Sequence, residues 1–307
     1  MRLATPKSRR GLRMAANDTG PVGNQNGLVL VGLGLGTVEG MTLAAIEAAA
    51  TADHRRYEAY TALWSEAQLL RLEDKIGPIE RVMRPQVEQP DELLALAATS
   101  RVALLVVGDP LQATTHVDLQ LRAAEVGVPC EVVHGLSITT LVTGAIGLSN
   151  YKFGRQTTLT YPYGGWVATS PLEVIVANWS QGLHTLALLD LDPTGLGTGN
   201  QQPMRPADAA KAMHMMRDKL EEHLQGESAL DEENSWLNHM VEAQGRYLAE
   251  PFEAWPVVLC ADMGTPDQRV VATTLGALGQ EKGGRLNCLV FPARTGEVEE
   301  SALARWR

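Results

Sequence analysis

The stretch GDPLQATTH, residues 108–116, places an aspartate, a proline and two threonines directly after the apolar run RVALLVV. The apolar run predicts a buried strand and the following VDLQLRAAEVG predicts a helix, so the polar residues fall at the carboxyl end of a strand. A turn is the simplest interpretation, because glycine ends strands, proline fixes φ and aspartate accepts backbone hydrogen bonds. A binding role for Asp109 therefore needs support from neighbouring motifs.

A second candidate is the glycine-rich stretch VGLGLGTVEG, residues 31–40, which follows the first apolar run. Its glycines at 32, 34 and 36 give GxGxG, without the third glycine spacing of the dinucleotide fingerprint and without a clear acid closing the second strand. Glycine here indicates a tight turn or a close approach of the backbone to another group. The sequence contains no Gly-Lys-Ser/Thr, so a Walker loop that hydrolyses nucleoside triphosphates is not indicated.

Other kinds of site have less support. The seven histidines show no HExxH and no paired Cys/His spacing, so we expect no metal. Cys130, Cys260 and Cys288 are widely spaced within apolar runs, which favours reduced, buried thiols over disulfides. Ser137 stands at a predicted helix start, where capping is the simpler use, and no GxSxG elbow is present. The sequence thus assigns no nucleophile.

The elements that must position these residues alternate between short apolar runs and helical patterns from Gly27 onward. This alternation predicts an α/β fold with a mainly parallel sheet. The run at 54–61 is a doubtful strand, because Arg55 and Arg56 are poor strand residues. The other expected strands are 28–34, 79–84, 101–110 and 130–135, and the expected helices are 41–52, 90–99, 116–127 and 137–147.

The pattern restarts near LSNYKFGR, which predicts two α/β domains, residues 27–149 and 150–307. The charged, weakly helical segment at about 227–255 is interpreted as an insertion or lid. Ser170 is the predicted cap of a helix over 170–182. A further helix is expected at 206–226, and a short strand that runs into a helix is expected within 268–280. Further strands are expected at 157–163, 183–192, 255–264 and 286–293.

Charge and hydropathy limit the possible partners. The first thirteen residues hold five cations and no acid, so the overall charge of −10 becomes −15 for the rest of the chain. Such an acidic body repels phosphate, which argues against nucleic-acid binding. No apolar run reaches the roughly 18 residues that span a bilayer, and the N-terminus lacks a secretory core. We expect a cytoplasmic protein without membrane contact, and a disordered leader over residues 1–26.

The motifs together resemble one family. VGLGLG, VVGDPLQATTH, HGLSI, YKFG, YPYGGWVATSP and GLHTLALLDLD, in this order, are similar to the diphthine synthases, which belong to the tetrapyrrole methylase class of S-adenosylmethionine-dependent methyltransferases. The resemblance is close over 28–192 and looser over 255–292. The GDP turn is common to the class, whereas YKFG, GGW…TSP and GLHTL are narrower. The related corrin, porphyrin and ribosomal RNA methyltransferases usually carry a PGDP-like turn where this chain has GLGTVEG.

The resemblance implies a fold and a cofactor site. In this class S-adenosylmethionine lies folded in the cleft between two α/β domains. Its cationic sulfonium suits nearby carbonyl oxygens and a carboxylate such as Asp109. The family position of Asn287 is often histidine, and the alignment at Ala261 and Asn287 is looser. The implied cofactor contacts are Leu35, Asp109, Gln112, Ser137, Ile138, Leu189, Ala261 and Asn287.

The resemblance also implies a reaction, the repeated methylation of the amino group of a 3-amino-3-carboxypropyl-histidine on translation elongation factor 2. In-line displacement at an activated methyl group needs alignment more than a nucleophile or metal. His184 and Asp109 are candidate proton acceptors, and neither is assigned. Tyr161, Tyr163 and Trp166 either face the methylammonium or pack at a domain edge.

A homodimer is implied by the resemblance alone. Two alternatives remain: a tetrapyrrole or corrin methyltransferase of the same fold, and a nucleotide-binding module that uses the glycine-rich loop.

Overall fold

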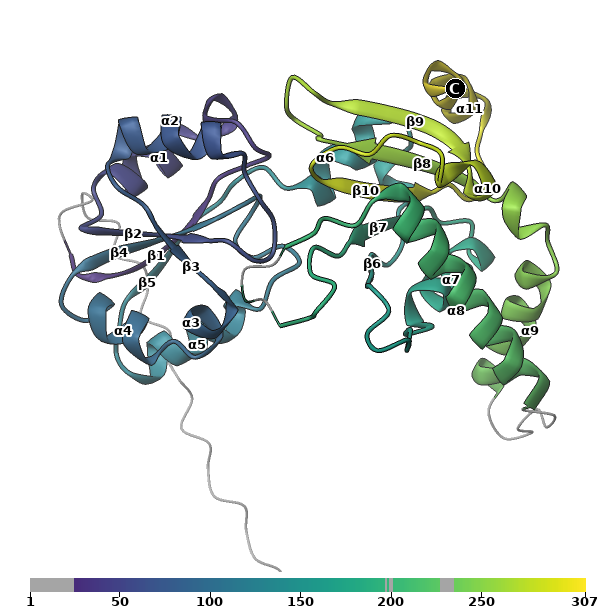
Figure 1. The fold of residues 1–307 in the computed structure, drawn as a ribbon, viewed down its shortest axis with the longest axis horizontal. Coiled ribbons are helices and arrows are strands. Elements are labelled where there is room, and N and C mark those ends of the chain that lie inside the picture. The colour runs from purple at the N-terminus through teal and green to yellow at the C-terminus, as the bar shows by residue number, and fades with distance from the viewer. Residues whose placement is uncertain (1–24, 197, 199–200, 227–234) are drawn as a thin grey trace, which may run out of the picture.

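The computed structural model describes residues 25–196, 198, 201–226 and 235–307, and two five-stranded sheets form two lobes (Figure 1). The first sheet has the order β3-β2-β4-β1-β5 and its paired strands are all parallel. The α/β architecture predicted from the alternating pattern is confirmed. The strands are β1 (Gly27–Gly32), β2 (His54–Glu58), β3 (Glu80–Val82), β4 (Arg101–Val106) and β5 (Cys130–Val133).

Helices cover both faces of the first sheet (Figure 1). Every residue of β1 and β4 is buried as a result, which is why these strands are continuous apolar runs. Along β1, Val29 and Val31 join the core on one face, and Leu28 and Leu30 join the core on the other. The helices are α1 (Leu43–Ala50), α2 (Glu66–Ile76), α3 (Arg84–Glu88), α4 (Asp91–Ala97) and α5 (His116–Glu125).

The doubtful basic strand is β2, and its arginines have local partners. The guanidinium of Arg55 donates to the carbonyl oxygens of Ala49, Ala50 and Ala52, at distances of 2.7 to 2.9 Å. These carbonyls lie at and just beyond the end of α1, where a cation also suits the helix dipole. Arg56 forms an ion pair across the sheet with a glutamate of β3. Both arginines therefore bind neighbouring segments, so their charges do not prevent this strand from forming.

The second sheet, in the order β6-β7-β10-β8-β9, corrects the expectation of mainly parallel pairing. Only β6 and β7 pair in parallel, and the other three pairs are antiparallel. The prediction rested on alternation of strands and helices, but β8 and β9 are joined by a short turn, which permits antiparallel pairing. The strands are β6 (Thr157–Leu159), β7 (Thr185–Leu189), β8 (Pro256–Ala261), β9 (Arg269–Thr274) and β10 (Asn287–Phe291).

The two faces of the second sheet carry different helices. Ala187 and Leu189 of β7 pack in the core that holds the buried methionines of α8, whereas Leu186 packs with Val142 of α6. By this packing α6 belongs with the second sheet, although it precedes the predicted boundary at residue 149. The helices are α6 (Ile138–Ala145), α7 (Ser170–Ser180), α8 (Pro206–Gly226), α9 (Ser235–Leu248), α10 (Leu275–Leu278) and α11 (Glu297–Leu303).

The cap of α7 is Thr169 rather than Ser170, which is the first helical residue. Residues 1–24 of the predicted leader and 227–234 of the predicted insertion lie outside the described residues. The described end of the insertion contributes Phe252 and Trp255 to the core, and its helix α9 lies at the outer end of the second lobe (Figure 1). Among the described residues, no helix is long and apolar enough to cross a membrane.

Candidate functional site

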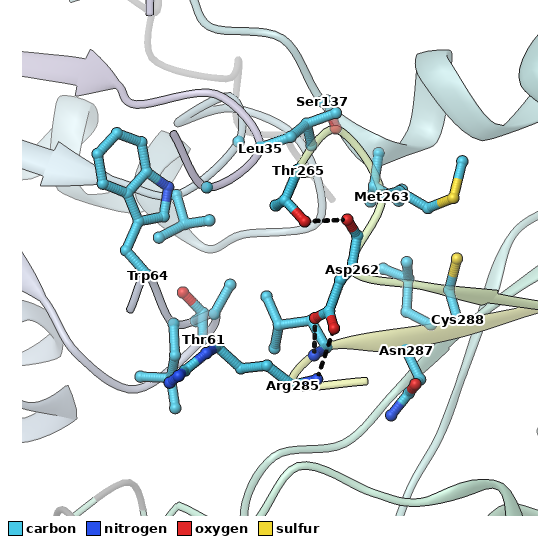
Figure 2. A pocket seen from close by; sticks show the side chains of 18 of the residues that line it. Leu35, Thr61, Trp64, Ser137, Asp262, Met263, Thr265, Arg285, Asn287 and Cys288 are labelled. Atoms are coloured by element: carbon cyan, nitrogen blue, oxygen red, sulfur yellow. Dashed lines mark hydrogen bonds between the residues drawn. The ribbon is translucent and has the colours of Figure 1, made fainter. Parts of the chain in front are cut away.

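A cavity of about 520 Å³ lies between the two lobes, at the carboxyl ends of β1, β2 and β4. Seven of the eight predicted cofactor contacts line it, and Figure 2 shows the part around Trp64 and Asp262. The exception is Ala261, which is buried between two lining residues, Cys260 and Asp262. The seven are Leu35, Asp109, Gln112, Ser137, Ile138, Leu189 and Asn287.

On the first-domain side of this cavity, three glycines are in close contact. Each of them ends or follows a parallel strand: Gly32, Gly108 and Gly135. A Cβ on Gly135 would lie 2.3 Å from the carbonyl oxygen of Gly108, and a Cβ on Gly32 would lie 2.4 Å from the nitrogen of Gly135. Gly108 also has φ +79°, which favours glycine. The glycines therefore let three strand ends converge under the cavity.

Asp109 connects two of these strand ends. One carboxylate oxygen accepts from the backbone N–H of Leu111 at 2.9 Å, within the GDP turn. The other accepts from the N–H of Gly135 at 3.2 Å and lies 2.8 Å from Nδ1 of His134. The side chain is 8% exposed. Asp109 is therefore both the turn residue of the simplest interpretation and a buried negative charge in the cavity wall.

Ser137 caps α6, as predicted, and also lines the cavity. Its hydroxyl accepts from the N–H of Thr139 at 3.3 Å and lies 2.9 Å from the Thr139 hydroxyl. That hydroxyl in turn is 3.4 Å from the amide oxygen of Gln112 in the GDP turn. The cap thereby connects the start of α6 to the first domain. Capping and cavity lining are compatible uses of the same serine.

Two residues of the cavity wall have left-handed backbone conformations although neither is glycine. Ala113 has φ +56° and Asp262 has φ +47°. The Asp262 conformation is held by its carboxylate, which accepts from the N–H groups of Arg285 and Leu286 at 3.1 and 3.0 Å (Figure 2). Such conformations cost about 1–3 kcal/mol and concentrate at functional sites. Each lobe thus contributes one strained backbone position to the cavity wall.

Comparison with known proteins agrees with this geometry. Residues 27–279 match the family of Tetrapyrrole (Corrin/Porphyrin) Methylases. The diphthine synthase of Halorubrum lacusprofundi is 34% identical over 286 residues, which cover 90% of this chain and 95% of that protein. The chain belongs to the diphthine synthases.

Other diphthine synthases are also similar to this chain. The Haloquadratum walsbyi diphthine synthase is 32% identical over 90% of this chain and 94% of its own length. The Methanoregula boonei diphthine synthase is 39% identical over 57% of this chain and 70% of its own. A crystal structure of a diphthine synthase superposes with a TM-score of 0.71 at 28% identity, covering 91% of this chain and 95% of that one. The protein is therefore a methyltransferase.

Sequence reasoning missed several cavity residues. The loop of residues 61–65 lines the cavity and includes Trp64, whose indole N–H donates to the carbonyl oxygen of Gly34 at 3.4 Å. Ser65 caps α2, by accepting from the N–H of Gln68, and this cap was the available signal. Arg285, on the opposite side, extends toward the side of Thr61 (Figure 2). Nothing local in the sequence singled out Arg285.

His184 is not placed to accept a proton from a ligand in the cavity. It is fully buried, and its Nδ1 accepts from the N–H of Ala293 at 2.9 Å. Its Nε2 then donates to Glu299 at 3.1 Å. Burial lowers the pKa of His184, although Glu299 opposes the shift, so the ring is held neutral. His184 lies outside the cavity and serves to anchor α11.

The aromatic residues of YPYGGW also lie outside the cavity lining. The Tyr163 hydroxyl donates to Asp190 at 2.5 Å, and the Tyr161 hydroxyl donates to the carbonyl oxygen of Gln202 at 3.0 Å. Trp166 is 60% exposed and carries the ammonium of Lys219 4.3 Å from its ring centroid. None of the three side chains therefore lines the cavity, and Tyr161 packs against the hydrophobic core of the second lobe.

The glycine-rich loop does not have the geometry of a dinucleotide site. Helix α1 begins at Leu43, seven residues after Gly36, so its N-terminus does not follow the glycines directly. Instead Gly34 and Gly108 exchange backbone hydrogen bonds of 3.1 and 2.8 Å. The loop thus packs against the GDP turn. Among the described residues, no cluster of His, Cys, Asp or Glu could hold a metal ion.

Proposed function

We propose that this protein binds S-adenosylmethionine in the cavity between its two lobes and uses it to methylate, repeatedly, the amino group of the 3-amino-3-carboxypropyl-histidine on translation elongation factor 2, in the diphthamide pathway. The observation that carries the proposal is the convergence of the GDP turn, the GLSI helix start, the end of β7 and the start of β10 on one cavity. The first three belong to the motifs that carry the family resemblance, and β10 lies in the looser part of it.

The residues present fit such a cofactor. The cavity volume of about 520 Å³ lies within the roughly 300–1,000 Å³ of small-molecule sites. Leu35, Ile138 and Leu189 supply apolar surface, while Asp109 and Asn287 supply polar groups. The buried carboxylate of Asp109 places negative charge in the wall, which favours a cationic ligand. Ala261 contributes through its backbone position between two lining residues.

When bound, S-adenosylmethionine supplies an electrophilic methyl group that departs from a neutral thioether. The chain's task is then to hold the acceptor amine in line and to exclude water. None of the described residues that line the cavity is a histidine. With His184 buried elsewhere, the proton of the product ammonium goes to solvent or to a carboxylate at the cavity. We assign no catalytic base.

The acceptor side of the proposal rests on family membership. The relatives are named diphthine synthases, and the family resemblance implies an acceptor side chain on a folded protein. The acidic body of this chain suits a protein partner better than ribosomal RNA. We further propose that the enzyme is a cytoplasmic homodimer. Sedimentation at micromolar concentration that shows only a 33.1 kDa species would contradict the dimer.

The cofactor half of the proposal is tested by calorimetric titration with S-adenosylmethionine and with NAD. We expect binding of the first and none of the second, because the glycine-rich loop lacks a helix N-terminus for pyrophosphate. A labelled methyl group from bound S-adenosylmethionine should then appear on elongation factor 2 that carries the unmethylated precursor. Tight NAD binding without a response to S-adenosylmethionine would overturn the assignment.

A further inference from the structure

A buried histidine and a buried glutamate meet just behind the cavity wall. Glu58 ends β2 and His116 begins α5, and their side chains are 0% and 2% exposed. Nε2 of His116 lies 2.6 Å from Oε2 of Glu58. Neither residue lines the cavity, and the proposed chemistry does not use them. Two ionisable groups are costly to bury unless they are paired, so this pair calls for an explanation.

The geometry fixes how many protons the pair holds. Nδ1 of His116 lies 2.8 Å from the carbonyl oxygen of Pro110, and a carbonyl oxygen only accepts. Nδ1 therefore carries a proton. A second proton on Nε2 makes the 2.6 Å contact with Glu58 an attractive ion pair. With that proton the pair is neutral overall. Without it, two acceptors face each other and a net negative charge is buried.

Each partner also reaches a wall of the cavity. The other carboxylate oxygen of Glu58 accepts from the hydroxyl of Thr61, which lines the cavity. Pro110, the acceptor for His116, belongs to the GDP turn. Its carbonyl oxygen also accepts from the hydroxyl of Thr114, a second lining residue, at 2.8 Å. The hydrogen bonds of Thr61 and Pro110, joined by the ion-pair contact between Glu58 and His116, thus connect the 61–65 loop to the GDP turn.

We propose that His116 and Glu58 are positioning residues: the proton they share holds the 61–65 loop and the GDP turn in place on the first-domain side of the cavity, so that losing this proton weakens cofactor binding. The inference rests on the proposed function, in which this cavity holds S-adenosylmethionine. A role is thereby assigned to His116, the last residue of the GDPLQATTH stretch, and to Glu58, the last residue of β2.

The other charged groups around His116 are already paired. Glu88 of α3, and Asp118 and Arg122 of α5, line a small hollow beside the histidine. Asp118 pairs with Arg122 at 2.7 Å, and Glu88 lies 3.7 Å from Arg84. Burial lowers the pKa of His116, but the hydrogen bond and the charge of Glu58 outweigh it, so the pKa is raised overall. Glu58 is therefore the charge that keeps the histidine protonated.

The first test is the affinity for S-adenosylmethionine across pH 6 to 10, for wild type, His116→Gln, Glu58→Gln and the control Asp118→Asn. Wild type and control should bind with constant affinity at low pH and weaken roughly tenfold as pH passes the raised pKa, a change within the usual coupling range. His116→Gln should bind about tenfold more weakly at pH 7 and lose this pH dependence, which separates the pair's titration from that of the ligand. Wild-type affinity and an unchanged pH profile in His116→Gln would overturn the proposal.

A second test needs no variant. Nitrogen NMR of the wild-type imidazole should show both His116 nitrogens protonated at pH 7.5, and adding S-adenosylmethionine should raise the histidine's pKa, because linkage is reciprocal. A neutral ring, or a pKa that the ligand leaves unchanged, would contradict the pair's role. If wild type binds no S-adenosylmethionine at any pH, the proposed function itself fails, which is a different outcome.

Discussion

At the scale of single residues, the cavity depends on groups that combine structural and binding roles. The carboxylate of Asp109 is held by the N–H groups of Leu111 and Gly135, and so it ties the turn after β4 to the turn after β5. The sequence alone predicts that a carboxylate in a turn contributes little to the stability of the fold. In the structure its removal would leave buried donors without an acceptor, which costs about 1–3 kcal/mol.

Two substitutions of Asp109 separate its charge from its hydrogen bonds. Asp109→Asn keeps one acceptor oxygen but turns an NH2 donor toward the N–H of either Leu111 or Gly135, so we expect a smaller loss of stability than in Asp109→Ala. Its affinity for S-adenosylmethionine should fall about tenfold or more through loss of charge. Asp109→Ala should in addition lose about 1–3 kcal/mol of unfolding free energy. Calorimetry and urea denaturation measure the two effects. Unchanged cofactor affinity in a folded Asp109→Asn variant would return Asp109 to a turn residue alone.

Gly135 should tolerate no side chain. Its Cβ would lie 2.3 Å from the carbonyl oxygen of Gly108, so Gly135→Ala must separate two strand ends. We expect a loss of about 1–3 kcal/mol of unfolding free energy, the usual cost of overpacking. Gly144 of α6 is the control, because nothing lies within 4 Å of its Cβ and alanine favours helix. Denaturation that shows equal stability for both variants would contradict the close-contact explanation.

At the scale of elements, the sequence predicts what local patterns determine. Apolar runs located β1, β4 and β5, the 79–84 segment contains β3, the doubtful strand at 54–61 is β2, and the 206–226 helix is α8 as predicted. Helix α2 was missed because its apolar residues are interspersed with many charges, and α11 because it is short and begins with glutamates. The antiparallel pairing of the second sheet depends on contacts between β10 and its neighbours, residues far apart in the chain, which no local pattern records.

In the candidate site, too, local patterns predict some features and contacts between distant residues determine the others. Turn and cap chemistry is local, so the sequence predicted the structural roles of Asp109 and Ser137. All eight predicted cofactor contacts, these two included, came from the family resemblance. Trp64, Asp262 and Arg285 reach the cavity only because two sheets bring their loops together, so the sequence offered no signal strong enough to select them. Their assignment required the three-dimensional arrangement.

Helix α11 should confer acid sensitivity. Burial opposes ionisation of Glu299, but Lys152, two backbone N–H groups and His184 outweigh it and lower its pKa to about 2. A depressed carboxyl pKa contributes stability that is present above the unfolded value of about 4.5 and is lost as pH falls toward 2. Glu299→Gln should therefore unfold more easily at pH 7, by about 1–3 kcal/mol. The difference from wild type should shrink below pH 4.

Thermal unfolding of both proteins between pH 2.5 and 7 measures this difference. Glu300, on the same helix, is the control, because its hydrogen bond to Thr295 is exposed. Glu300→Gln should follow the wild-type pH profile. A Glu299→Gln variant that parallels wild type across the whole range would show that α11 is not anchored through this carboxylate.

At the scale of the whole molecule, the account requires two lobes to enclose one cofactor while leaving access for a protein acceptor. The first sheet contributes the GDP turn and the second contributes the ends of β7 and β10. Free small amines should be poor acceptors, because they lack the remote contacts that align the amine. The described part of the predicted insertion packs at the outer end of the second lobe, so this part does not close the cavity.

The most direct test is the intact mass of elongation factor 2 after incubation with the enzyme and S-adenosylmethionine. Factor that carries the unmethylated 3-amino-3-carboxypropyl-histidine should gain more than one methyl group, and factor with its target histidine replaced should gain none. Equal methylation of the two factors would show that the methyl group goes elsewhere and would contradict the proposed function.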